Sequence, residues 1–157
     1  MDDIFTKKLV KIAVTLAACI AAVYALIYVD VVLRARSAYM EGEKYWSWSQ
    51  DPKLKDAAIQ DWYLAEKRKV DKKQSKNTIT KDEYDRQLEL LDFTKSQKLR
   101  ESSIKYAYIW YQTVVELFSP PESKWVRLAR EKMPKAKDLW KKELTDKKIP
   151  FEEYMLD

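Results

Sequence analysis

The chain of 157 residues has no histidine, one cysteine and one glycine. Without histidine, this chain cannot build the common zinc sites, a histidine-ligated haem, or the Ser-His and Cys-His catalytic pairs. One cysteine excludes an internal disulfide framework. The chain also lacks a Gly-rich phosphate loop or a nucleophile with a convergent base. We therefore expect no cofactor, no metal and no enzymatic activity.

The scarcity of glycine also indicates a helical protein, since ordinary usage is roughly 7%. Charged residues make up 35% of the chain. Acids precede bases by four residues, as in Asp82 with Arg86 and Glu101 with Lys105, a spacing that stabilises helix surfaces. These charges indicate a solvated helix face rather than a catalytic set. The sequence predicts an all-α protein.

One long apolar run follows a short N-terminal tail over 1–11. From Ile12 to Leu33 the only charged residue is Asp30, and about 20 apolar residues suffice to cross a bilayer. This predicts a transmembrane anchor over 12–33. A cleaved signal peptide and a lipobox, "LAAC" ending at Cys19, stay open as alternatives. The apolar sequence continues well beyond Cys19, where a processed lipoprotein normally becomes polar, and this favours a retained anchor.

Small residues recur along one side of the predicted anchor. Small side chains let two spanning helices approach closely, so this stripe predicts a helix-packing face formed by Ala13, Ala17, Ala21 and Ala25. The alternative is that alanine only fills the helix. Asp30 precedes Arg34 by four residues, which predicts an interfacial ion pair, and a proton-transfer role for Asp30 is the alternative.

The basic residues on the two sides of the run are equal in number and give little indication of its orientation in the membrane. Lys7, Lys8 and Lys11 precede it, and three basic residues follow it, namely Arg34, Arg36 and Lys44. A short basic leader before an apolar run is typical of an uncleaved signal anchor. We therefore expect a cytoplasmic N-terminus and an extracytoplasmic C-terminal domain.

An aromatic juxtamembrane segment over 34–50 comes next, helical to about Trp46. Amphipathic rings favour the headgroup level or a protein surface lying on it. They predict interfacial anchors at Tyr39, Tyr45, Trp46 and Trp48.

Residues 51–118 have the pattern of an antiparallel helical hairpin. Asp51 before Pro52 predicts the start of the first helix. Thr80 and Glu83 have capping-box spacing and predict a second helix that runs to Phe118. The stretch "ITKDEY" resembles the opening of the second helix in small bacterial hairpin domains. That resemblance covers about eight residues and implies a helix cap but no function.

The end of this second helix is apolar on nearly all sides, which requires burial on nearly all sides. The surplus indicates contact with a protein partner or a membrane surface, since Tyr and Trp are enriched at both. We predict a partner interface, extended by two later tryptophans: Tyr106, Ile109, Trp110, Val114, Leu117, Trp125 and Trp140. A core within the chain is the alternative.

In 119–157 we expect short helices begun by prolines, with Ser119 as a cap before Pro120, and further starts at Pro134 and Pro150.

The net charge of +5 comes from 30 bases interleaved with 25 acids. Because no recognition motif accompanies them, we expect no nucleic-acid partner, and lipid headgroups suit these lysines better. The leading hypothesis is a single-pass membrane accessory or structural subunit. Its partners would be the lipid bilayer and other membrane protein subunits, and it would dock on and stabilise a larger complex such as a bioenergetic one. The alternative is a membrane-tethered helical module that binds a ligand, a lipid or a soluble partner.

Overall fold

The computed structural model describes residues 2–156, with side chains over 10–156, and this part of the chain contains helices and no strand. The prediction of an all-α protein is confirmed. Its elements are α1 (Asp2–Gln50), α2 (Pro52–Ser75), α3 (Lys81–Arg100), α4 (Ser103–Leu117), α5 (Lys124–Asp146) and the short 3-10 helix η1 (Glu153–Leu156).

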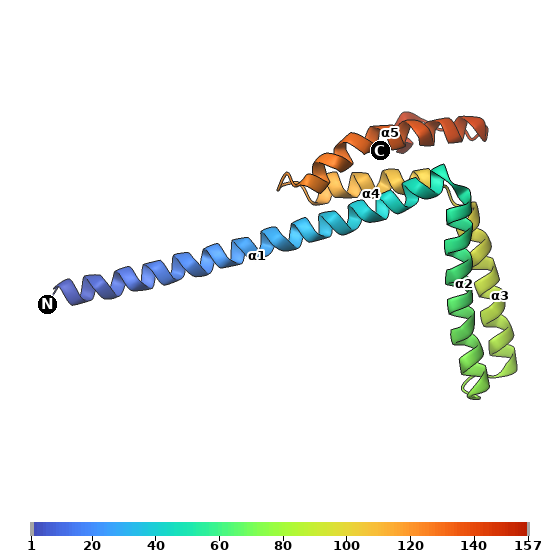
Figure 1. Ribbon diagram of the computed structural model, residues 1–157, viewed down its shortest axis with the longest axis horizontal. Coiled ribbons are helices and arrows are strands. Elements are labelled where there is room, and N and C mark those ends of the chain that lie inside the picture. Colours follow the sequence, from blue (N-terminus) through green and yellow to red (C-terminus); the bar gives the residue numbers. More distant parts are fainter. Residues whose placement is uncertain (1, 157) are drawn as a thin grey trace.

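Helix α1 joins the apolar run to the folded body without a break. Its 49 residues span about 74 Å at 1.5 Å per residue. The N-terminal half extends alone, and the C-terminal part packs against α4 and α5 (Figure 1). The expected end near Trp46 is wrong, because the helix continues to Gln50. Residues 34–50 are therefore part of the same helix as the apolar run.

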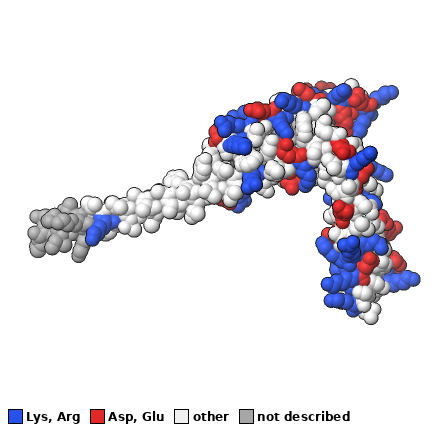
Figure 2. Space-filling model, viewed as in Figure 1, with Lys and Arg blue, Asp and Glu red and all other residues white. Residues whose placement is uncertain are grey.

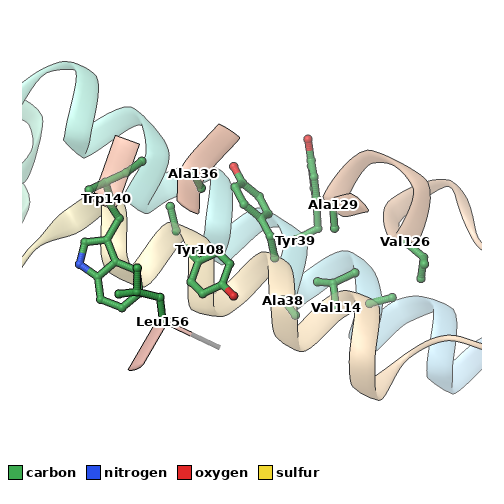
Figure 3. Close-up of a cluster of buried hydrophobic side chains, with 13 residues drawn as sticks. Ala38, Tyr39, Tyr108, Val114, Val126, Ala129, Ala136, Trp140 and Leu156 are labelled. Atoms are coloured by element: carbon green, nitrogen blue, oxygen red, sulfur yellow. The ribbon is translucent and has the colours of Figure 1, made fainter. Parts of the chain in front are cut away.

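The core lies where α4 packs between α1 and α5 (Figure 3). Small residues from all three helices are fully buried there, Ala35, Ala107 and Ala129 among them. Short side chains let the helices approach closely and leave room for the completely buried ring of Tyr111. At the far end of the chain, η1 places Leu156 in the same core. Helices α1 and α5 thus bury much of the apolar surface of α4 within this chain.

Helices α2 and α3 form a second unit, which we call the arm (residues 52–100). They pack side by side and project crosswise from the end of α1 (Figure 1). The arm buries few apolar residues, chiefly Ile59 and Leu91. Polar contacts supplement them, such as the 2.8 Å hydrogen bond that the Tyr84 hydroxyl donates to Asp71. With so little burial, the arm should open locally more readily than the core.

Both caps predicted for the arm are present. Asp51 accepts a hydrogen bond from the backbone N–H of Lys53 at 3.0 Å, with Pro52 in the first turn of α2. The Thr80 hydroxyl accepts from the N–H of Glu83 at 3.2 Å, and the Glu83 carboxylate accepts from the N–H of Thr80 at 2.8 Å. These reciprocal bonds satisfy amide groups that a helix start leaves without partners.

Replacing Thr80 with alanine should weaken the start of α3 by about 1 kcal/mol, because the N–H of Glu83 loses its acceptor. Hydrogen exchange of amides in the first turn of α3 should accelerate roughly fivefold. Thr94→Ala is the matched control, since that hydroxyl only donates to the carbonyl of Leu90 within the same helix. Equal acceleration in the two variants would contradict the capping role.

The single second helix expected over 80–118 is wrong, because the chain divides it after Arg100. Ser102 caps a new helix by accepting from the N–H of Lys105 at 3.2 Å. Lys55 donates to the carbonyls of Leu99 and Glu101 at 2.9 and 2.5 Å. The break lets α4 leave the arm and return along α1. The burial of α4 against α1 and α5 favours two separate helices over one continuous helix.

None of the three expected proline starts opens a helix. Ser123 caps α5, so Ser119 and Pro120 precede the helix rather than open it. Pro134 lies inside α5 and does not end it. An interior proline costs about 3 kcal/mol, but buried residues anchor α5 to the core on both sides of it, Val126 before and Trp140 after. Pro150 precedes the short η1, which begins at Glu153.

Candidate functional site

The most prominent surface of the molecule is the apolar part of α1, residues 12–33, which we call the shaft. Its most apolar 18-residue window has a mean hydropathy of 2.4, and none of that window is buried within the described chain. The shaft is long and apolar enough to cross a membrane, as signal sequences also are. Figure 2 shows a rod almost free of charge that leads to the charged folded body.

The predicted small-residue stripe lies on this shaft. All four of its alanines are exposed, namely Ala13, Ala17, Ala21 and Ala25. At the end of the shaft, Arg34 donates to Asp30 at 2.8 Å, so the predicted ion pair is present. Both of these side chains are more than half exposed.

The aromatic residues after the shaft contact other rings of the chain. Tyr39 is buried and lies 5.8 Å from Tyr111, ring centroid to ring centroid. Tyr45 stacks on Tyr106 at 5.2 Å and meets the edge of Trp48 at 5.1 Å. Trp46 packs on the core. The structure thus corrects the expectation for Tyr39, whose ring is enclosed by α4 and α5 and presents almost no surface to lipid headgroups.

The predicted partner interface divides into three groups by burial. Val114 and Trp140 belong to the core, and Tyr106, Trp110 and Trp125 are partly buried. The structure thus corrects the expectation for Val114 and Trp140, which contact other helices of this chain. Ile109 is 37% exposed and Leu117 is 70% exposed. Most of the apolar surplus is therefore covered by α1 and α5, and Leu117 is the member left largely uncovered.

A half-buried polar cluster that sequence reasoning missed links the three core helices. Both carboxylate oxygens of Glu43 accept from Lys132 at 2.6 Å, and one accepts from the Tyr111 hydroxyl at 2.6 Å. Burial alone would raise the pKa of Glu43, but hydrogen bonds from Lys132, Tyr111 and Tyr39 outweigh it and hold the pKa below its ordinary value. The only sequence signal was an acid within an aromatic stretch. This arrangement can clamp α1, α4 and α5 together.

The arm presents an exposed apolar face and a basic end. Leu90 and Phe93 are 64% and 66% exposed, and Leu90 lines a shallow groove of about 240 Å³ that also passes Trp62 and Val70. Seven bases and two acids lie between residues 66 and 81. Figure 2 shows the bases gathered at the free end of the arm. Such a surface suits a protein partner that carries acidic groups.

Two cavities lie where the arm meets the core. The more enclosed one, of about 200 Å³, lies between Tyr45, Trp48, Trp62 and Tyr106, with three lysines at its edge: Lys44, Lys55 and Lys98. Burial lowers the pKa of Lys55. The second, of about 460 Å³, is open and lined mainly by polar and charged side chains. Drug-sized ligands usually occupy about 300 to 1,000 Å³, so the aromatic cavity is small for such a ligand.

Within residues 10–156 no three Asp, Glu or Cys side chains gather as a metal-binding group. Comparison with protein-family models, curated proteins and solved structures finds no match to this chain.

Proposed function

We propose that this protein is a single-pass membrane accessory subunit without catalytic activity, which docks on a larger membrane protein complex and stabilises it. The shaft would be its retained anchor, and the core would hold the arm out towards a partner. The observation that carries this proposal is the continuity of α1. One rigid helix contributes both the exposed apolar rod and a wall of the folded core.

The exposure of the shaft supports retention of the anchor. Cleavage before Cys19 would leave a protruding apolar helix in water, with Leu26 and Leu33 still 71% and 56% exposed. Exposing such a patch is costly and promotes aggregation. A bilayer covers the same surface favourably, since the apolar length fits its hydrocarbon thickness.

The position of the arm supports a partner beside the anchor. From Leu33 to Gln50, α1 rises about 26 Å, and α2, with 24 residues, is about 36 Å long. Because the arm projects crosswise to α1 (Figure 1), it would run roughly parallel to the membrane at that height. There it can reach the extramembrane part of a neighbouring subunit. We place this domain on the extracytoplasmic side, following the basic leader before the shaft.

Extraction of the native protein in a mild detergent, followed by size analysis and mass spectrometry, tests this proposal. We expect co-migration with a fixed set of membrane proteins. Ala17→Leu with Ala21→Leu should abolish it, because bulky side chains hold neighbouring helices apart. Val23→Leu with Ile27→Leu, on another side of the shaft, is the matched control and should preserve it. Migration as a lone monomer or homodimer would contradict an accessory subunit.

The aromatic cavity favours a second candidate function, a membrane-tethered binding module. Its rings and lysines suit a small anionic aromatic ligand through stacking and charge. Such a ligand would raise the melting temperature of the native chain. It should not raise the melting temperature of the Trp62→Ala variant. If neither the wild type nor the variant responds to aromatic carboxylates, this candidate fails.

A further inference from the structure

The loop between α4 and α5 lies on the side of the core that faces the N-terminal half of α1 (Figure 1). We call residues 117–125 the α4–α5 turn. The ring of Trp125 is 5.7 Å from the guanidinium carbon of Arg36 and 5.7 Å from the ring of Tyr39. Arg36 follows the last residue of the shaft, Leu33, by three positions. Along the axis of α1 this separation is only about 4.5 Å.

The surface of the turn combines apolar and basic groups. Leu117 is 70% exposed, and Pro120 of the same turn is also exposed. Trp125 lies near two cations, with Lys124 at 5.4 Å from its ring in addition to Arg36. The nearby acids include Glu122, which accepts from Arg130 at 2.8 Å, and Glu116, which accepts from Gln112 at 2.8 Å.

We propose that the α4–α5 turn is a second membrane contact that inserts Leu117 into the headgroup region and binds anionic lipids through Arg36 and Lys124. The inference rests on the proposed anchor and deepens it. Because α1 is one unbroken helix, a shaft within the bilayer brings the adjacent turn to the membrane surface. Aromatic and basic residues are favoured at that level.

This contact has a consequence for the arm. A single spanning helix can rotate about its own axis and tilt, commonly by about 20°. A second contact beside the helix opposes both motions. It would therefore set the direction in which the arm points and its height above the membrane.

Single-cysteine labelling of the full chain in lipid vesicles tests the proposal. In a Cys19→Ser background, an environment-sensitive fluorophore is placed at Leu117→Cys, or as a matched control at Phe93→Cys on the arm, where exposure is similar at 66%. A third sample carries the label on the native Cys19 in the shaft. The vesicles contain phosphatidylcholine with or without phosphatidylglycerol, and some carry brominated acyl chains as quenchers.

We expect blue-shifted emission and quenching at position 117, deeper quenching at position 19, and water-like emission at position 93. Quenching at 19 with water-like emission at 117 would overturn the docked turn and leave the anchor intact. Absence of quenching at 19 would overturn the anchor and the turn together. These outcomes separate failure of the further inference from failure of the proposed function.

The contribution of anionic lipid is tested by Arg36→Gln with Lys124→Gln. In vesicles with phosphatidylglycerol, the ratio of docked to free turn should fall roughly fivefold for each charge removed. Lys73→Gln with Lys76→Gln, at the end of the arm, removes the same charge and should leave the quenching at 117 unchanged. An equal loss in both double variants, or none in either, would overturn the assignment of these two cations.

Discussion

Gly42→Ala is expected to lower the free energy of unfolding by about 2 kcal/mol, within the range typical of overpacked cores. A methyl group at Gly42 would lie 2.7 Å from Cε1 and 2.9 Å from Cδ1 of Tyr111. That ring cannot move aside easily, because it is fully buried between α1, α4 and α5. The only glycine of the chain is thus the point where α1 makes room for Tyr111, the largest fully buried side chain among the described residues.

The sign of this effect tests the packing argument, because helix propensity alone predicts that alanine stabilises α1 by about 1 kcal/mol. Thermal unfolding of the full chain in detergent, followed by near-ultraviolet circular dichroism, should show a melting temperature lower by roughly 4 to 8 °C. In a Tyr111→Leu background the same change should be neutral or stabilising. An unchanged or higher melting temperature in the wild-type background would contradict the close contact.

Glu43→Ala is expected to destabilise the protein by about 2 to 3 kcal/mol. Lys132 loses its carboxylate partner, and the Tyr111 hydroxyl loses its acceptor inside the core. Glu41→Ala is the matched control on the same helix. Its partner Lys44 is also on α1, and both side chains are about 40% exposed, so its loss should cost less than about 1 kcal/mol. Equal destabilisation in the two variants would show that the hydrogen bonds of Glu43 to Lys132 and Tyr111 stabilise the fold no more than an exposed ion pair.

The hydrogen bonds of Glu43 also predict that the stability of the fold depends on pH. Because the folded state holds the pKa of Glu43 below its ordinary value of 4.5, the ionised carboxylate contributes stability at neutral pH. This contribution should disappear as the pH falls from 4.5 through the lowered pKa. The stabilities of the wild type and Glu43→Gln should therefore differ at neutral pH and converge in acid. Curves that stay parallel through this range would contradict the assignment.

Local chemistry explains which parts of the fold could be predicted. The caps at Asp51 and Thr80 involve residues two or three positions apart, so the chain order already contains both partners. The pair of Asp30 with Arg34 spans one helical turn and was equally accessible. The break at Ser102 was missed because a serine is compatible with a helix surface as well as with a cap. Ser102 acts as a cap because a new helix beginning there allows α4 to be buried against α1 and α5.

The prolines and the aromatic residues show the limits of local patterns. A proline start and an interior proline look alike in sequence, and Pro134 stays within α5 because the same core holds both halves of that helix. The apolar helix at 104–118 correctly indicated burial on many sides. Whether another chain or this chain covers it depends on how α1 and α5 pack against it.

By itself, the sequence determined the helical class, the long apolar run and the positions of the arm caps, since these follow from composition and from neighbours within one helical turn. Only the tertiary structure decided that α1 continues into the core, that Val114 and Trp140 lie inside it, and that Glu43 pairs across 68 and 89 positions with Tyr111 and Lys132. The physical reason is that burial and ion pairing depend on distances in space. Those distances are set when distant helices exclude water from a shared core.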